Sequence, residues 1–232
     1  MKLLLLSNST NPTESYMQWC SSTIVSFLTG HTSNVVFIPY AGVGISYIDY
    51  TEKVNIALSE WGLSVNNLDD YEDKKAAIQN ASAILVGGGN TFHLLRELQR
   101  FQLTVCMNEI ISFGTPYVGW SAGSNIASPT ICTTNDMPIV QPKSFKALHL
   151  VPFQINPHYT EDVIPNHGGE SKEQRLKEFL AINPDQKIVA LPEASYLIKV
   201  NDTCKYVGHK DGVLFTLDRK DRIRNHTEVI FE

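Results

Sequence analysis

The amino-acid sequence predicts a three-layer α/β fold, in which a mostly parallel β-sheet is flanked by helices. Short apolar runs alternate with longer segments whose apolar residues recur at helical spacing, which is the pattern of βαβ units. The chain has 232 residues, a length that one domain can fill, and it shows no internal repeat or low-complexity linker. We therefore expect residues 1–232 to form a single domain.

The first half of the chain alternates between predicted strands and predicted helices. The strands are expected over residues 2–6, 34–39, 63–66, 83–86 and 116–119. Helices are expected over residues 16–28, 47–61, 74–80 and 91–113, the last broken near Gln102. Because crossovers between parallel strands are right-handed, these helices should cover both faces of the sheet.

The second half begins with an aperiodic stretch. Residues 129–148 are rich in Pro, Thr, Asn and Asp, and a loop of this length inside a compact domain is usually functional. A strand over 151–156, a helix over 172–180 that begins after Ser171, and a strand over 187–191 are expected next. Alternating apolar and polar residues then predict antiparallel edge strands over 196–200, 213–217 and 227–231.

Composition and charge exclude several classes of function. The net charge is -5, whereas a face that binds nucleic acid needs surplus Lys and Arg to neutralise phosphates. No apolar run approaches the ~20 residues of a membrane-spanning helix, and the N-terminal apolar run lacks the features of a signal peptide. The four cysteines form no C-x-x-C pair, so we expect neither a metal site nor a cofactor. These features predict a cytoplasmic protein that acts on small molecules or peptides and leave its oligomeric state open.

The string Gly119-Trp120-Ser121-Ala122-Gly123 follows a predicted strand and precedes small, helix-compatible residues. A G-x-S-x-G string on a strand-to-helix turn exposes the serine hydroxyl at the carboxyl edge of the sheet, where it can act as a nucleophile. The amide of Ala122 then faces the oxygen of an attacked carbonyl. Gly and Ser also form ordinary tight turns, so the catalytic interpretation depends on the strand context.

A second glycine string, Gly87-Gly88-Gly89, follows a strand and leads into the helix expected to begin at Thr91. Its backbone amides suit either a phosphate group or the second oxyanion donor opposite Ser121. The string lacks the G-x-G-x-x-G pattern and the P-loop lysine. We favour the oxyanion interpretation because both loops leave parallel strands at one edge of the sheet.

A serine nucleophile needs a base, and the base needs an acid that orients it. His158 follows a predicted strand and should project from the carboxyl edge of the sheet, with His167 in a glycine-rich turn as second candidate. Glu193 and Asp136 are the candidate acids. Glu193 is favoured because it ends a strand expected to share that edge, whereas Asp136 lies in the long loop.

Six strings together resemble the peptidase E family of α-aspartyl dipeptidases. They run in the family's order over nearly the whole chain, and their coincidence is far more specific than any one of them. The strings are Leu6-Ser7-Asn8-Ser9-Thr10, Val86-Gly87-Gly88-Gly89-Asn90-Thr91-Phe92, Gly119-Trp120-Ser121-Ala122-Gly123, Thr133-Thr134-Asn135-Asp136-Met137-Pro138-Ile139, Ile155-Asn156-Pro157-His158 and Leu191-Pro192-Glu193.

The resemblance implies metal-free hydrolysis of dipeptides with an N-terminal aspartate, on a fold similar to class I glutamine amidotransferase domains. It implies Ser121 as nucleophile, His158 as general base and Glu193 as orienting acid. The amides of Gly89 and Ala122 would form the oxyanion hole. Asp136 matches a further acidic position of the family.

An N-terminal aspartate needs a cation for its side chain and an acceptor for its ammonium group. Lys172 and Arg175 are the candidate cations, although solvated residues on an amphipathic helix would give the same pattern. Candidate pocket residues are Asn90, Asn135 and Asp136.

The chain departs from the family pattern at Lys172 and Cys132, where the family has arginine. Because lysine does not replace a bidentate arginine, the strictness for aspartate is the property in question. Two alternatives stay open: an exopeptidase that acts on another acidic peptide, such as a cyanophycin-like polymer, and a catalytically silent protein that binds a phosphate or nucleotide through the glycine string.

Overall fold

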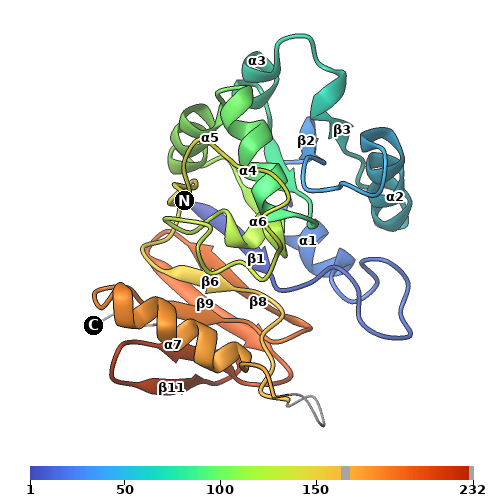
Figure 1. Cartoon of the computed structure of the whole chain (residues 1–232). Coiled ribbons are helices and arrows are strands. Elements are labelled where there is room, and N and C mark those ends of the chain that lie inside the picture. Colours follow the sequence, from blue (N-terminus) through green and yellow to red (C-terminus); the bar gives the residue numbers. More distant parts are fainter. Residues whose placement is uncertain (163–167, 230–232) are drawn as a thin grey trace.

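The computed structural model describes residues 1–162 and 168–229 and confirms the predicted three-layer fold class (Figure 1). Its larger sheet has the strand order β3-β2-β4-β5-β1-β8-β9. The parallel strands are β1 (Lys2–Leu6), β2 (Val35–Ile38), β3 (Asn66–Asn67), β4 (Ala83–Val86) and β5 (Tyr117–Trp120). Two strands, β8 (Ser195–Val200) and β9 (Thr203–Gly208), complete one edge in antiparallel orientation.

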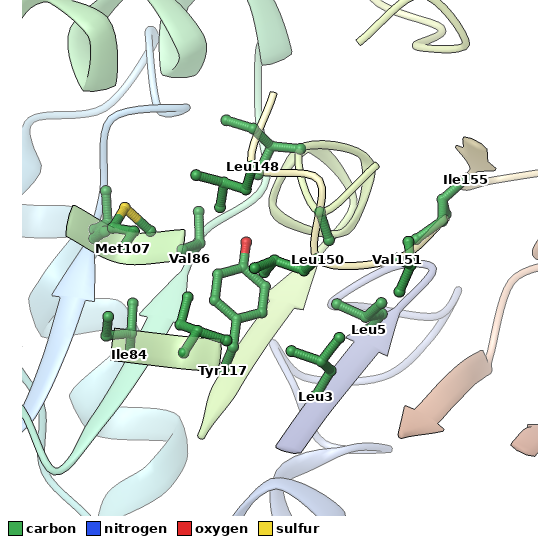
Figure 2. Close-up of a cluster of buried hydrophobic side chains, with 14 of the residues drawn as sticks. Leu3, Leu5, Ile84, Val86, Met107, Tyr117, Leu148, Leu150, Val151 and Ile155 are labelled. Atoms are coloured by element: carbon green, nitrogen blue, oxygen red, sulfur yellow. The ribbon is translucent and has the colours of Figure 1, made fainter. Parts of the chain in front are cut away.

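Helices cover both faces of this sheet because alternate side chains of its strands point in opposite directions. Leu3 and Leu5 belong to one buried cluster and Leu4 and Leu6 to another. The first cluster includes residues of α3 (Lys74–Gln79), α4 (Thr91–Arg100), α5 (Leu103–Ser112) and α6 (Ala122–Asn125). The second includes residues of α1 (Ser21–Phe27) and α2 (Tyr47–Ser59). Figure 2 shows part of the first cluster, where side chains of β1, β4 and β5 meet those of the segment 148–155.

A second sheet has the order β11-β10-β7-β6. In it β6 (Gln154–Asn156) runs parallel to β7 (Ile188–Ala190), and β10 (Gly212–Phe215) and β11 (Lys220–Ile223) are antiparallel. The last helix, α7 (Lys172–Ile182), packs on this sheet through Leu176 and Leu180 (Figure 1).

The expectation that His158 and Glu193 project from the same sheet as Ser121 is wrong. Their preceding strands, β6 and β7, lie in the second sheet, while β8 takes the place beside β1. The pattern of one strand does not encode which sheet it joins. The single domain over residues 1–232 stays a prediction, and it is supported by Leu5 of β1 and Val189 of β7 belonging to one buried cluster.

Several boundaries differ from those expected. The first helix begins at Ser21 rather than at residue 16, since Met17 has a φ of 60°, which no right-handed helix accommodates. The strand expected over 63–66 is reduced to Asn66–Asn67 at the sheet edge, and the strand expected over 151–156 begins at Gln154. The predicted helix break is confirmed at Gln102, whose φ is 56°.

The C-terminal segment is less regular than expected. The sequence analysis did not predict β9 and β11 as strands. The described part of the strand expected over 227–231 forms only an isolated bridge between Glu228 and Lys205, and residues 230–231 lie outside the described residues. No helix among the described residues is long and apolar enough to cross a membrane.

Candidate active site

Ser121 lies on a sharp turn between β5 and α6, with a φ of 53° and a ψ of -112°. Positive φ is costly for a residue other than glycine, so the surrounding structure must enforce this conformation. The flanking glycines allow it. A Cβ atom on Gly119 would lie 2.3 Å from the carbonyl oxygen of Gly123, and one on Gly123 would lie 2.2 Å from that of Val86. The turn therefore requires glycine on both sides of the serine.

Ser121, His158 and Glu193 form a continuous hydrogen-bonded relay. His158 Nε2 lies 2.7 Å from Ser121 Oγ, and His158 Nδ1 lies 2.7 Å from Glu193 Oε1. With the imidazole proton on Nδ1, the ring donates to the carboxylate and its Nε2 is free to accept the serine proton. The side chain of His158 is 35% exposed and that of Glu193 is 51% exposed, so the relay is open to solvent on one side. His167 lies outside the described residues.

The relay stands where carboxyl ends of strands from two different sheets meet. Ser121 directly follows β5 of the larger sheet, whereas His158 and Glu193 follow β6 and β7 of the second. Asn125, at the end of α6, donates to the carbonyl oxygen of Ile155 at 2.7 Å and so ties the nucleophile helix to β6.

The glycine string after β4 lies directly beside Ser121. A Cβ atom on Gly88 would lie 3.0 Å from Ser121 Cβ. Gly89 has a φ of 136°, and a Cβ there would lie 2.1 Å from the carbonyl oxygen of Ala41. Within the described residues, no hydrogen bond uses the amide of Gly89 or of Ala122. Both donors are thus available to an oxyanion.

Tyr50 of α2 joins the glycine string to the nucleophile strand. Its hydroxyl donates to the carbonyl oxygen of Gly88 at 3.0 Å and accepts from Trp120 Nε1 at 3.2 Å. Burial raises the pKa of Tyr50, which keeps this hydroxyl protonated. Tyr50 is not among the site residues predicted from the sequence, because an apolar position on a predicted helix gives no functional signal.

A cavity of about 480 Å³ opens beside the relay. Its walls include Ser121, His158 and Glu193, together with Gly88, Gly89 and residues 42–45. Of the described residues that line the cavity, Lys53 is the only Lys or Arg, and its Nζ lies 4.3 Å from the centre of the Tyr16 ring. Among the described residues no carboxylate lies within 4.0 Å of Lys53 Nζ. Lys53 is not among the site residues predicted from the sequence, since a lysine on a helix is typical of a solvated surface position.

A second hollow, of about 470 Å³, lies between α2 and β3 and contains none of the predicted site residues. Within the described part of the chain, no cluster of three or more His, Cys, Asp or Glu side chains is arranged to hold a metal ion.

A family model described as peptidase family S51 matches residues 3–207. The chain belongs to peptidase family S51. It is therefore a serine-type peptidase, as the sequence analysis predicts.

Relatives and solved structures agree with this membership. A protein named peptidase E from Nostoc sp. is 48% identical over 214 residues, which cover 92% of this chain and 88% of that protein. A peptidase E from Shigella flexneri is 46% identical over 197 residues, covering 85% of this chain and 86% of the relative. A crystal structure from Listeria monocytogenes, assigned to peptidase E, superposes with a TM-score of 0.68 at 25% identity and covers 89% of this chain and 98% of its own.

A structure of a peptidase from an acI-B1 Actinobacterium gives a TM-score of 0.72 at 16% identity, covering 99% of this chain and 96% of its own, and so shows likeness of fold. These structures confirm the class I glutamine amidotransferase-like fold that the resemblance implies.

In this S51 peptidase Asp136, the acidic loop residue predicted near the site, stabilises the N-terminus of α4 through hydrogen bonds. Asp136 Oδ2 accepts from the amide of Thr91 at 2.7 Å, from Thr91 Oγ1 at 2.6 Å and from Thr134 Oγ1 at 3.0 Å. Asn90 is the N-cap of the same helix, α4, and donates to the carbonyl oxygen of Met137 at 2.9 Å. Neither side chain bonds to His158, and neither lines the cavity.

Asn135 and Lys172 contact the segment that carries His158. Asn135 Nδ2 donates to the carbonyl oxygen of Pro157 at 2.7 Å, and Lys172 Nζ donates to that of His158. Desolvation lowers the pKa of Lys172, while the charge of Glu193 acts in the opposite direction. Arg175 is 69% exposed, and its Nε lies 3.8 Å from Glu170. None of the three lines the cavity.

Proposed function

We propose that this S51 peptidase hydrolyses dipeptides with an N-terminal aspartate through an acyl-enzyme formed on Ser121. The observation that carries the proposal is the relay in which His158 lies 2.7 Å from both Ser121 Oγ and Glu193 Oε1. Further support comes from relatives named peptidase E that share nearly half of their residues with this chain.

In the proposed reaction, His158 Nε2 takes the hydroxyl proton of Ser121 while Oγ attacks the carbonyl carbon of the first residue. Glu193 stabilises the imidazolium that forms. The amides of Gly89 and Ala122 hold the oxyanion. The imidazolium then protonates the leaving nitrogen, the C–N bond breaks, and a water molecule activated by His158 hydrolyses the ester.

Two lysines supply positive charge for an acidic peptide. Lys53 stands in the cavity wall with no carboxylate partner in the described part of the chain, so a carboxylate of the bound peptide fits there. Lys172, the second candidate cation, lies half-buried beside the carbonyl oxygen of His158 and outside the cavity lining, so it supplies positive charge near the relay rather than at the cavity wall. Asn90, Asn135 and Asp136 then act through the loop and helix start that they hold.

A substrate panel tests the proposal. Asp-Leu should be turned over, whereas Asn-Leu and N-acetyl-Asp-Leu should be slower by on the order of 10²-fold, since the cation or the acceptor that pairs with the charge of the substrate is left unpaired. Equal rates on Asp-Leu and Asn-Leu would refute the preference for aspartate. Faster cleavage of β-aspartyl-arginine would favour the exopeptidase alternative. Calorimetric binding of nucleotides without any peptidase activity would favour the silent binding protein.

The variant Lys53→Gln identifies which carboxylate of the dipeptide Lys53 binds. Its KM for Asp-Leu should rise about tenfold with little change in kcat, because binding alone is weakened. The rise should disappear with Asp-Leu amide if Lys53 binds the terminal carboxylate, and with Asn-Leu if it binds the side chain. Lys75→Gln, on α3 away from the cavity, is the control. An unchanged KM in Lys53→Gln would remove Lys53 from the site.

We also propose a cytoplasmic location. All four cysteines are unpaired and three of them are buried, as is common in proteins kept under reducing conditions. Recovery of the protein from an oxidising compartment after cell fractionation would contradict this location.

A further inference from the structure

Leu6 is the last residue of β1, and it and the next two residues, Ser7 and Asn8, bind the backbone of every segment that carries a member of the relay. The carbonyl oxygen of Leu6 accepts from the amide of Ser121 at 3.1 Å. Ser7 Oγ accepts from the amide of His158 at 2.8 Å. Asn8 Oδ1 accepts from the amide of Ala194, next to Glu193, at 2.8 Å.

Each of these contacts lies at a strained point of the chain. Ser121, His158 and Ala194 have φ values of 53°, 56° and 58°. Left-handed backbone costs a residue with a side chain about 1 kcal/mol or more, and it persists only where neighbouring groups hold it. The end of β1 therefore bonds to the positions at which the three segments would otherwise relax.

Ser7 makes two of the hydrogen bonds that join the larger sheet to the second sheet. Its hydroxyl proton goes to the carbonyl oxygen of Leu191 at 2.8 Å, which leaves its lone pairs to accept from His158. Its side chain is fully buried, so water cannot replace either partner. One hydroxyl thus joins the chain just after β6 to the chain just after β7, two residues before Glu193.

We propose that Ser7 is a positioning residue for the relay: together with the backbone bonds that Leu191 makes to Asn156 and Tyr159, it holds the strained turn at His158, so that the imidazole meets Glu193 and Ser121 together. This inference rests on the proposed function of the relay. Loss of the Ser7 hydroxyl leaves the three side chains present, but it leaves the amide of His158 without its acceptor and removes one of the bonds to the carbonyl oxygen of Leu191.

The test compares Ser7→Ala with Ser82→Ala. Ser82 makes the same pair of bonds at the amino end of β4, far from the relay: its Oγ accepts from the amide of Asn34 and donates to the carbonyl oxygen of His31, both at 2.9 Å. Both variants should lose stability, and only Ser7→Ala should lose kcat. Misplacement of catalytic groups by about 1 Å can cost 10²-fold, so we expect a fall of 10- to 100-fold with KM nearly unchanged.

The pH profile of kcat/KM separates positioning from general destabilisation. When the hydrogen bond between Glu193 and the imidazole ring of His158 is misaligned, the imidazolium is less stabilised. The acid limb of the Ser7→Ala profile should therefore move to lower pH. Ser82→Ala should keep the parent profile. If Ser7→Ala does not fold, Ser7→Cys, similar in shape but a weaker hydrogen-bonding group, should show the same changes to a smaller degree.

The proposal is overturned if Ser7→Ala, or Ser7→Cys where the alanine variant does not fold, keeps kcat within about twofold of the parent and an unshifted acid limb. That outcome leaves the proposed function intact. Failure of the function itself would instead appear as an active Ser121→Ala variant.

Discussion

The backbone amide of His158 donates to the hydroxyl of Ser7 at 2.8 Å, although 151 residues separate the two in the sequence. The contact joins the end of β1 in the larger sheet to the end of β6 in the second sheet. The relay is therefore assembled by the junction of two sheets, and its geometry depends on bonds that fix one sheet relative to the other.

The first prediction separates the two candidate acids. Glu193→Gln should fold but lose kcat steeply, by up to about 10⁴-fold, because an amide cannot stabilise the imidazolium. Asp136→Asn weakens the cap of α4, so it should cost about 1 kcal/mol of stability and raise KM more than it lowers kcat. Steady-state kinetics of both variants on Asp-Leu provide the measurement. The opposite pattern would move the role of orienting acid to Asp136.

The second prediction concerns the glycine string. Gly89→Ala would place a Cβ 2.1 Å from a backbone oxygen, so the loop must move and the oxyanion loses a donor. We expect kcat to fall by about 10²–10³-fold. Gly30→Ala is the matched control, since Gly30 has a φ of 82° with no atom near the added Cβ. It should lower the free energy of unfolding by about 1–2 kcal/mol without affecting kcat. Equal kinetic effects in both variants would show that backbone strain alone is responsible.

The sequence predicts those parts of the site that depend on residues close together in the chain. The turn at Ser121 is visible because Gly119 and Gly123 are needed within four residues of each other, where any Cβ would collide with backbone. The strands that end before His158 and Glu193 are also predictable from the sequence, because each is a short local run of apolar residues. The placement of these strands in a second sheet cannot be predicted in this way, because sheet membership is decided by contacts between distant strands.

The contributions of Tyr50, Lys53 and Ser7 could not be predicted from local pattern. Tyr50 reaches Gly88 from 38 residues away, and an aromatic residue at helical spacing is typical of an ordinary core position. Ser7 is recognisable only as part of a string shared with the peptidase E family. Asn90 and Asp136 are close in sequence to the predicted site, yet their side chains hold the start of α4.

The third prediction concerns stability in acid. Lys220 Nζ lies 2.6 Å from Glu161 Oε1 and also bonds to Glu173. Bonds from Lys220 and Arg222 lower the pKa of Glu161, and bonds from Lys177 and Lys220 lower that of Glu173. Because both pKa values are lowered on folding, this stabilisation is present above the ordinary carboxyl pKa and is lost as pH falls through the lowered values.

Lys220→Met should therefore be less stable than the parent by about 1 kcal/mol at pH 7, a small effect because solvent screens these partly exposed charges. The difference should shrink towards zero in acid. Urea unfolding at neutral and acidic pH measures it. A difference that is constant with pH would indicate lost packing rather than lost charge.

The fourth prediction uses the thiols. Burial raises the pKa of Cys20 to about 12 and that of Cys204 to about 11, and it also raises that of Cys106. Since the thiolate is the reactive form, a disulfide reagent should modify one thiol per native chain rapidly, the exposed Cys132. Cys132→Ser should abolish the fast phase. Rapid reaction of more than one thiol in the native protein would contradict the described burial.

The central claim is that Ser121 carries the acyl group. Incubation with a fluorophosphonate, followed by mass spectrometry of proteolytic peptides, tests it most directly. The account predicts a stoichiometric adduct on Ser121, loss of Asp-Leu turnover in step with labelling, and neither labelling nor turnover in a folded Ser121→Ala variant. A Ser121→Ala enzyme with turnover within about tenfold of the parent would contradict the account.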